Sequence, residues 1–181
     1  MRGIRSAASA ARASRDTEFT EFVQAASPSL LRAALVLLDS REDAEDALQL
    51  TLLRTYRRWE QANQAPQAYA RTALVNACRE RWRHRRRHPE FSQDLDDIAN
   101  VVSFAEAVDR RHVLVRVLRR LPGIQREVLV CRYLLDATVA ETAAALGIAV
   151  GTVMSAASGG LDQLRQLLRE EEERGCRVHP R

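Results

Sequence analysis

Apolar residues recur at three- and four-residue steps along most of this chain, which is the period of an amphipathic helix. The first run covers residues 17–38, and Pro28 is expected to divide or kink it because proline removes a helical N–H. A second run, residues 43–59, leads into a short polar loop at residues 60–64. Its outer face carries two leucines, Leu50 and Leu53, which pack on another helix of the same domain or form a docking patch for a partner. Both interpretations stay open.

The stretch 65–87 predicts a long helix with two distinct faces. Pro66 suits a first-turn position, where its missing N–H has no cost, and no proline or glycine follows before Pro89. An apolar face contains Ala70, Ala73, Leu74 and Ala77. A neighbouring polar stripe contains Thr72, Asn76, Arg79 and Arg83.

Six arginines crowd the end of this helix, namely Arg79, Arg81, Arg83, Arg85, Arg86 and Arg87. Like charges at this density repel unless water or an anion meets them, and a nucleic-acid backbone is such an anion. A solvated helix end before a linker is the simpler alternative.

The second half of the chain predicts a helix-turn-helix. Residues 88–103 hold four acids and little periodicity, so we expect a linker there. Helices then resume at residues 104–121 and 124–135. Thr138 and Glu141 have the spacing of a capping box and open a short helix closed by Gly147. A longer helix, residues 150–169, follows after a three-residue turn.

Composition favours an all-α protein that binds an anionic partner. The 181 residues are 46% hydrophobic but only 5% aromatic, with seven Gly and five Pro. All 28 basic residues are arginine. Residues 1–88 carry 16 arginines against ten acids, a net charge of +6, whereas residues 89–181 carry 12 against 14, or −2. The basic surface therefore belongs to the N-terminal half.

Cysteine usage and the chain ends suggest a cytoplasmic protein without cofactors. Cys78, Cys131 and Cys176 are far apart and form no metal-binding pattern with the histidines, so reduced thiols are expected. No apolar run reaches the length of a membrane span, and no membrane partner is expected. We interpret residues 1–16 as a disordered tail and residues 171–181 as a frayed, solvated tail.

Taken together, these blocks resemble the extracytoplasmic-function (ECF) sigma factors, in particular the compact actinobacterial SigE-like kind. The resemblance covers roughly residues 17–169. It rests on FTEFV (19–23), DAEDALQLTLLRTYRRW (43–59), AYARTALVNACRERWRHRRR (68–87), LRRLPGIQREVLVCRYL (118–134) and VAETAAALGIAVGTV (139–153). It implies a promoter-melting helical bundle at residues 17–87 and a helix-turn-helix domain at residues 104–170. A flexible acidic linker would join the two, and neither would be catalytic.

The resemblance also implies partners and site residues. The partners are core RNA polymerase, at its β′ clamp helices and β flap, promoter DNA and, commonly in the family, an anti-sigma factor. The polymerase-facing residues would be Asp46, Gln49, Leu50 and Leu53. The −10 DNA would meet Asn63, Thr72, Asn76, Arg79, Arg83 and Arg86, with a flipped base received near Asn76. The arginines would hold phosphates without reading sequence.

The expected recognition helix for the −35 element departs from the family pattern. Ala149 replaces the usual N-cap serine, Met154 a lysine, and Ala156 and Gly159 two arginines. No residue between Thr142 and Leu161 is charged. The remaining candidates for −35 contact are Thr152, Ser155 and Ser158. Weak −35 binding, or a surface turned mainly to protein binding, is expected.

Three alternatives compete with the sigma-factor hypothesis. A stand-alone helix-turn-helix regulator would place its basic face on the second helix of the motif, which is neutral here. An enzyme would need ligands such as Asp43, Glu45 and Asp46, or Asp94, Asp96 and Asp97, but neither set has a histidine at ligand spacing. A degenerate sigma-like protein that acts through a protein partner is supported by the neutral recognition helix.

Overall fold

The computed structural model describes residues 2–62, 64–87 and 105–178, so the expected linker and Asn63 lie outside the described residues. Every regular element among those residues is helical, which confirms the all-α prediction. The elements are α1 (Arg2–Leu37), α2 (Arg41–Arg57), α3 (Trp59–Ala62), α4 (Pro66–Arg87), α5 (Ala105–Arg120), α6 (Gly123–Leu129), the π-helical turn η3 (Val130–Leu134), α7 (Val139–Leu146) and α8 (Val150–Val178).

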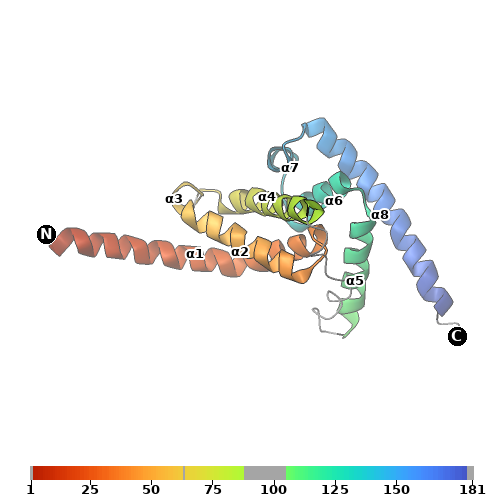
Figure 1. Cartoon of the computed structure of the whole chain (residues 1–181), viewed down its shortest axis with the longest axis horizontal. Helices are drawn as coiled ribbons and strands as arrows, with labels where there is room; N and C mark the ends of the chain where they lie inside the picture. The colour runs from red at the N-terminus through yellow and green to blue at the C-terminus, as the bar shows by residue number, and fades with distance from the viewer. Residues whose placement is uncertain (1, 63, 88–104, 179–181) are drawn as a thin grey trace.

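The helices gather into two groups that lie against each other (Figure 1). In the first group α1, α2 and α4 pack pairwise, and the short α3 connects α2 to α4. In the second group α8 packs on α5, α6 and α7. Contacts of α1 with α5 and η3, and of α4 with α7, join the groups. The N-terminal part of α1 and the C-terminal part of α8 project away from this centre at opposite ends (Figure 1).

The first helix is longer than the sequence suggested, and it is not divided at Pro28. It begins at Arg2, so the expected disordered tail at residues 1–16 is wrong for the part described. That segment is rich in alanine, the strongest helix former. It is also held at its end, because Arg15 donates to the Tyr56 hydroxyl at 3.0 Å and that hydroxyl donates to Asp16 at 2.8 Å. The helix continues through Pro28, which is exposed, so the proline does not divide α1.

Helix α2 has a well-formed start and a tightly packed inner face. Ser40 caps it by accepting from the Asp43 backbone N–H at 3.1 Å. Its buried residues are Ala44, Ala47, Thr51 and Thr55, and both threonine hydroxyls donate to carbonyls one turn back. Small residues on this face let α4 approach closely, and α4 presents the predicted apolar residues Ala70, Ala73, Leu74 and Ala77, all buried. The expected loop 60–64 contains the helical turn α3 instead.

The helix-turn-helix is confirmed in position and in its capping. The Thr138 hydroxyl accepts from the Glu141 N–H, and the Glu141 carboxylate accepts from the Thr138 N–H at 2.7 Å. Gly147 ends α7 with φ +66°, a left-handed conformation that glycine adopts without strain. Gly160 of α8 is buried, and a Cβ there would lie 3.2 Å from Leu129. The glycine that weakens α8 therefore lets α6 pack closely on it.

Helix α8 continues to Val178, beyond the boundary at residue 170, so the frayed tail expected after it is wrong for the described part. Two glutamates hold the start of this extension on α5. Glu171 pairs with Arg116 at 2.8 Å and with Arg120 at 3.3 Å, and Glu170 pairs with Arg120 at 3.1 Å. These ion pairs tie the extension to α5.

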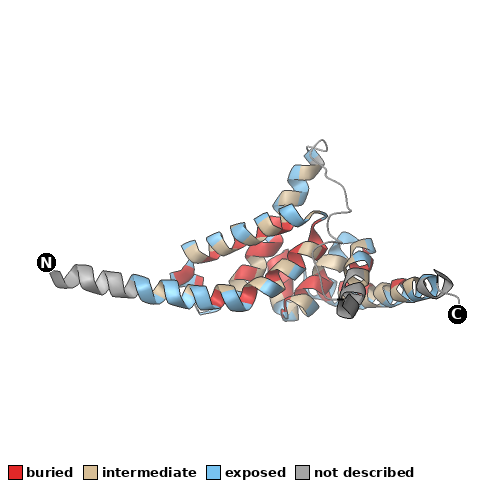
Figure 2. Ribbon diagram, turned by 90° about the horizontal axis from the view of Figure 1, so that it is seen from below, coloured by how far each residue is buried: buried red, intermediate tan, exposed pale blue. Residues whose placement is uncertain are grey.

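The buried residues form a core that runs across both groups (Figure 2). The larger cluster joins Leu30, Val36 and Leu74 of the first group to Val117, Val130 and Leu167 of the second. A smaller cluster brings Val75 of α4 together with residues of η3, α7 and α8. No single helix among the described residues is long and apolar enough to span a membrane, although α7 and the adjoining part of α8 meet the criteria as a pair bent by 103°.

Candidate nucleic-acid interface

A basic hollow lies between the end of α2 and the first half of α4. It has a volume of about 420 Å³ and is lined by Arg54, Arg57, Arg58, Tyr69, Thr72, Ala73 and Asn76. It lies at the contact of α2 with α4, whose inner faces pack through small buried residues. It offers an aromatic ring, an amide, a hydroxyl and three guanidinium groups to one ligand.

Two of these three arginines have no protein partner among the described residues. Arg54 is occupied, because it donates to Glu80 of α4 at 2.8 Å. Arg57 and Arg58 are exposed and make no side-chain hydrogen bond or ion pair within the described part of the chain. Their charges therefore remain available for an anion, and guanidinium is the side chain best matched to phosphate.

The predicted −10 residues fall into different environments. Thr72 and Asn76 line the hollow, half-buried and exposed respectively. Arg83 is exposed on the same helix. Arg86 belongs to α4, but its side chain, like Asn63, lies outside the described residues. The structure thus brings Thr72 and Asn76 together with arginines of α2.

Arg79 is directed toward the second group of helices. It donates to both carboxylate oxygens of Glu127 in α6, at 3.1 and 2.6 Å, and to the carbonyl oxygen of Leu146 at 2.9 Å. The hydrogen-bonded carboxylate of Glu127 raises the pKa of the Arg79 guanidinium. One turn or two earlier on α4, Arg71 pairs with Glu141 at 3.4 Å and Val75 is buried. This face of α4 is covered by the helix-turn-helix.

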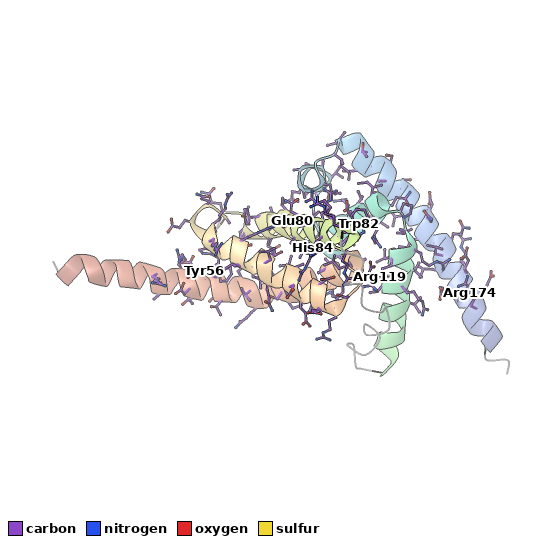
Figure 3. The ribbon with its side chains drawn as sticks, viewed as in Figure 1. Tyr56, Glu80, Trp82, His84, Arg119 and Arg174 are labelled. Carbon is purple, nitrogen blue, oxygen red and sulfur yellow. The ribbon has the colours of Figure 1, made fainter. Side chains whose placement is uncertain are left out.

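The arginines at the end of α4 are partly neutralised by α2, instead of standing free as the sequence suggested. Arg81 pairs with Asp46 and, at 3.4 Å, with Asp43, and Arg85 also pairs with Asp43. Side chains of this region, including Glu80, Trp82 and His84, surround the α4 end in Figure 3. The local fold therefore offsets part of the repulsion within the basic run.

The predicted polymerase-facing residues lie on the outer side of α2. Gln49 is exposed, and Leu53 keeps 45% of its surface accessible. Leu50 is half-buried and packs against the large core, so the two leucines have different environments. Asp46 is exposed but already paired with Arg81. The apolar patch is thus centred on Leu53 alone.

The predicted −35 residues Thr152, Ser155 and Ser158 are all exposed on α8. Val153 and Ala156 point the other way, into the smaller core cluster. Ala156 is only 8% exposed, so an arginine introduced there would enter the core. The family arginine expected at this position has no DNA-facing counterpart in this chain.

Sequence reasoning missed Arg57, Arg58 and Tyr69 as candidate site residues. Arg57 belongs to the polar side of α2, but among 28 arginines a pattern alone does not single it out. Its significance follows from the packing of α2 on α4, which brings it to Asn76. Among the residues that the structure describes, no three His, Cys, Asp or Glu side chains gather closely enough to hold a metal ion.

Family models match both groups of helices. Sigma-70 region 2 matches residues 22–88, and Sigma-70 region 4 matches residues 111–164. The RNA polymerase sigma-E factor of Streptomyces avermitilis is 36% identical over 80% of this chain and 81% of its own length, and that of Streptomyces coelicolor is 36% identical over 81% and 89%. The ECF RNA polymerase sigma factor SigM of Mycobacterium tuberculosis is 33% identical over 77% and 71%.

Two solved structures share the fold. The sigma factor RpoE of Bartonella quintana, in complex with the anti-sigma factor NepR, aligns with a TM-score of 0.66 at 23% identity, over 83% of this chain and 96% of that one. CnrH in complex with the cytosolic domain of CnrY aligns with a TM-score of 0.62 at 21% identity, over 84% and 88%.

Proposed function

This chain belongs to the ECF sigma factors, and from that premise we propose how its parts divide the work of promoter recognition. A sigma factor binds core RNA polymerase and directs promoter-specific transcription initiation. We assign core binding and the −10 element to residues 17–87, with Arg15 and Asp16 as part of the same unit. The −35 element falls to residues 104–170, and residues 88–103 act as the linker.

The basic hollow is the observation that carries the −10 assignment. A base extruded from the duplex costs a few kcal/mol, which contacts to the flipped base must offset. The ring of Tyr69 offers a stacking surface, and the exposed amide of Asn76 offers a donor and an acceptor to a base edge. Arg57 and Arg58 stand beside them as unpaired cations for the flanking phosphates.

The outer side of α2 is the proposed polymerase contact. Gln49 and Leu53 are accessible there, whereas Leu50 is half-buried against the core. Asp46 is paired with Arg81, so it can contact the polymerase only if this ion pair is shared or broken. This exchange would couple polymerase docking to the release of an α4 arginine toward DNA.

The remaining −10 assignments follow from position on α4. Arg83 and Arg86 lie beyond Arg79 on the same helix, from where they would reach the upstream phosphates. Asn63 lies three residues before the start of α4 and, in the sequence, between the two helices that line the hollow. Arg79 contributes only after it parts from Glu127. The second group of helices must therefore move off this face of α4 when promoter DNA binds.

We further propose that the chain has no catalytic activity or cofactor of its own and works in the cytoplasm with core polymerase. An anti-sigma partner fits the two solved structures, of which one is described as bound to the anti-sigma factor NepR. A degenerate, partner-dependent sigma-like role is the second candidate, supported by the uncharged segment from Thr142 to Leu161.

Run-off transcription with bacterial core polymerase tests the assignment, on promoter DNA selected by binding to the reconstituted holoenzyme. Asn76→Ala is expected to lower specific initiation by about fivefold to 100-fold, because a good side-chain contact to a base edge contributes about 1–3 kcal/mol. Core binding should be unchanged. Gln24→Ala, an exposed amide on α1, is the matched control and should initiate normally.

Each other outcome has a distinct meaning. Core binding without initiation by the unaltered chain would favour the degenerate, partner-dependent role. Initiation that is insensitive to Asn76→Ala would move −10 recognition away from the hollow. Absence of core binding would remove the proposed division of labour altogether.

A further inference from the structure

We propose that α8 reads duplex promoter DNA through the C5-methyl groups of thymine, with Val150 and Met154 as the side chains that contact them. The inference rests on the proposed −35 role of the second group of helices. It specifies which base is recognised and by which kind of contact, and it adds two residues that were not among the predicted −35 contacts.

The scaffold that would present α8 to a major groove is complete. The capping box of Thr138 and Glu141 starts α7, and left-handed Gly147 ends it. Val153 of α8 is fully buried with Val128 and Leu146 in the smaller core cluster. The orientation of α8 on α7 is therefore fixed by packing, and does not depend on the polar face that would meet DNA.

The outward face of α8 is unusual in what it exposes. Val150 keeps 49% of its surface accessible, and Met154, one turn later on the same side, keeps 62%. The other exposed residues of this stretch are Gly151, Thr152, Ser155 and Ser158. Large apolar side chains at this exposure are unfavourably hydrated, and covering them with a partner is favourable.

The groups that the four bases present in the major groove limit which base this face can recognise. Specific contact with guanine uses arginine or lysine, with adenine asparagine or glutamine, and with cytosine an acid. None of these residue types occurs between Val150 and Ser158. Thymine is the base that presents an apolar group to the major groove, and apolar side chains pack on that methyl. The hydroxyls of Thr152 and Ser155 can donate to or accept from the edge of a neighbouring base.

The same face predicts a low electrostatic contribution. Each phosphate neutralised by a cation releases counterions and steepens the dependence of affinity on salt. Segment 142–161 holds no charge, so contacts made by the part of α8 within it should be nearly independent of salt. Methyl contacts are the salt-independent interaction left to it, besides hydrogen bonds from hydroxyls and backbone.

The test uses the full chain in holoenzyme and a duplex promoter obtained by selection. Thymines in the −35 element are replaced by deoxyuridine, which removes the methyl group and keeps base pairing. The same number of thymines in the spacer is replaced in the control duplex. We expect the dissociation constant to rise about fourfold for each contacted methyl, the value of burying one such group, and to stay unchanged for the spacer duplex.

Two variants assign the effect to α8. In Met154→Ala and Val150→Ala, the unmodified promoter should bind more weakly and the deoxyuridine penalty should shrink toward one. Both positions are exposed and alanine favours helices, so folding is retained, which circular dichroism checks. Ile124→Ala removes an exposed apolar side chain from α6 and should keep the full penalty.

Three results would overturn the proposal. The first is a dissociation constant insensitive to deoxyuridine while initiation from the promoter stays normal, which leaves the sigma function standing. The second is a selection that returns no preferred −35 bases, which would assign the apolar face to a protein. The third is failure of the holoenzyme to bind any promoter, which would remove the sigma role as well.

Discussion

The two helices that this sigma factor would present to promoter DNA have opposite chemistry. Helix α4 carries seven arginines, several of them in ion pairs, and lies beside Arg57 and Arg58 at the end of α2, which are unpaired within the described part of the chain. Helix α8 exposes hydroxyls, glycine, valine and methionine and no charge over its first eleven residues. Strand opening requires both flipped bases and close phosphate contact, whereas a helix in a duplex groove can rely on shape and base edges.

Affinity for DNA and selectivity for a base sequence can therefore come from different helices of one protein. In the proposed assignment, charge on the α2–α4 face would supply attraction that is sensitive to salt and indifferent to sequence. The uncharged start of α8, residues 150–161, would add little attraction of that kind, so its contribution would come from fit to the bases. The two faces also interact, because Arg79 of α4 is bonded to Glu127 and Leu146 of the second group.

The largest expected effect comes from removing the unpaired charges of the hollow. The double variant Arg57→Ala/Arg58→Ala should weaken promoter binding by holoenzyme more than tenfold at low salt. It should also lower the slope of log affinity against log salt by about 1.4, since two single-strand phosphate contacts are lost. Titrations at several salt concentrations measure both quantities.

The matching change on the other face sharpens the contrast. Thr152→Ala/Ser155→Ala removes two exposed hydroxyls of α8 and no charge, so the salt slope should equal that of the unaltered chain. Equal slope losses in the two double variants would contradict the separation of roles between α4 and α8.

A smaller effect is expected from the ion pair that joins the two faces. Glu127→Gln keeps the shape of the side chain but removes the negative charge opposite Arg79, whose pair is about one-third exposed. The free energy of unfolding should fall by about 1 kcal/mol, because partial exposure screens the pair. Arg79 is then freer to meet DNA, so the free chain should bind single-stranded −10 DNA a few-fold more tightly.

Glu21→Gln on α1 is the control for this variant, because Glu21 is exposed and no ion pair is recorded for it among the described residues. It should change neither thermal stability nor DNA binding. Tighter DNA binding by both variants would show that net charge, and not release of Arg79, is responsible.

The smallest effect near neutral pH concerns the buried thiols of the two groups of helices. Burial raises the pKa of Cys78 in α4 and of Cys131 in η3 from 9.0 to about 12. Between pH 9 and pH 12 the folded chain therefore keeps the protons of both thiols, whereas the unfolded chain loses them. Stability should be unaffected below pH 9 and fall as pH rises from 9 toward 12, by about 1.4 kcal/mol per thiol for each pH unit.

Denaturant unfolding at pH 8 and pH 10 measures this loss. The variant Cys78→Ala/Cys131→Ala should lose less stability over the same interval, since the two groups that titrate are gone. An equal loss in both proteins would assign the alkaline sensitivity to other groups.

Local sequence patterns predicted much of the fold and part of the candidate site. Pro66 marked the start of α4, and Thr138 with Glu141 marked that of α7, because caps act within one turn of chain. Thr72 and Asn76 were placed on one stripe by helical period alone and do line one hollow. The patterns failed at the start of α1 and the end of α8, which lack an amphipathic period but gain contacts with Tyr56 and Arg120 respectively.

The sequence by itself determined the all-α class, the order of the helices, the capping of the helix-turn-helix and the absence of charge on the start of α8, since each depends on residue type and spacing along one element. Only the tertiary structure decided that Arg57 and Arg58 stand beside Asn76, that Arg79 turns to Glu127, and that Ala156 faces the core while Met154 faces outward. Those facts depend on which helices pack together and on which faces they bury, and helical period specifies a face without naming its partner.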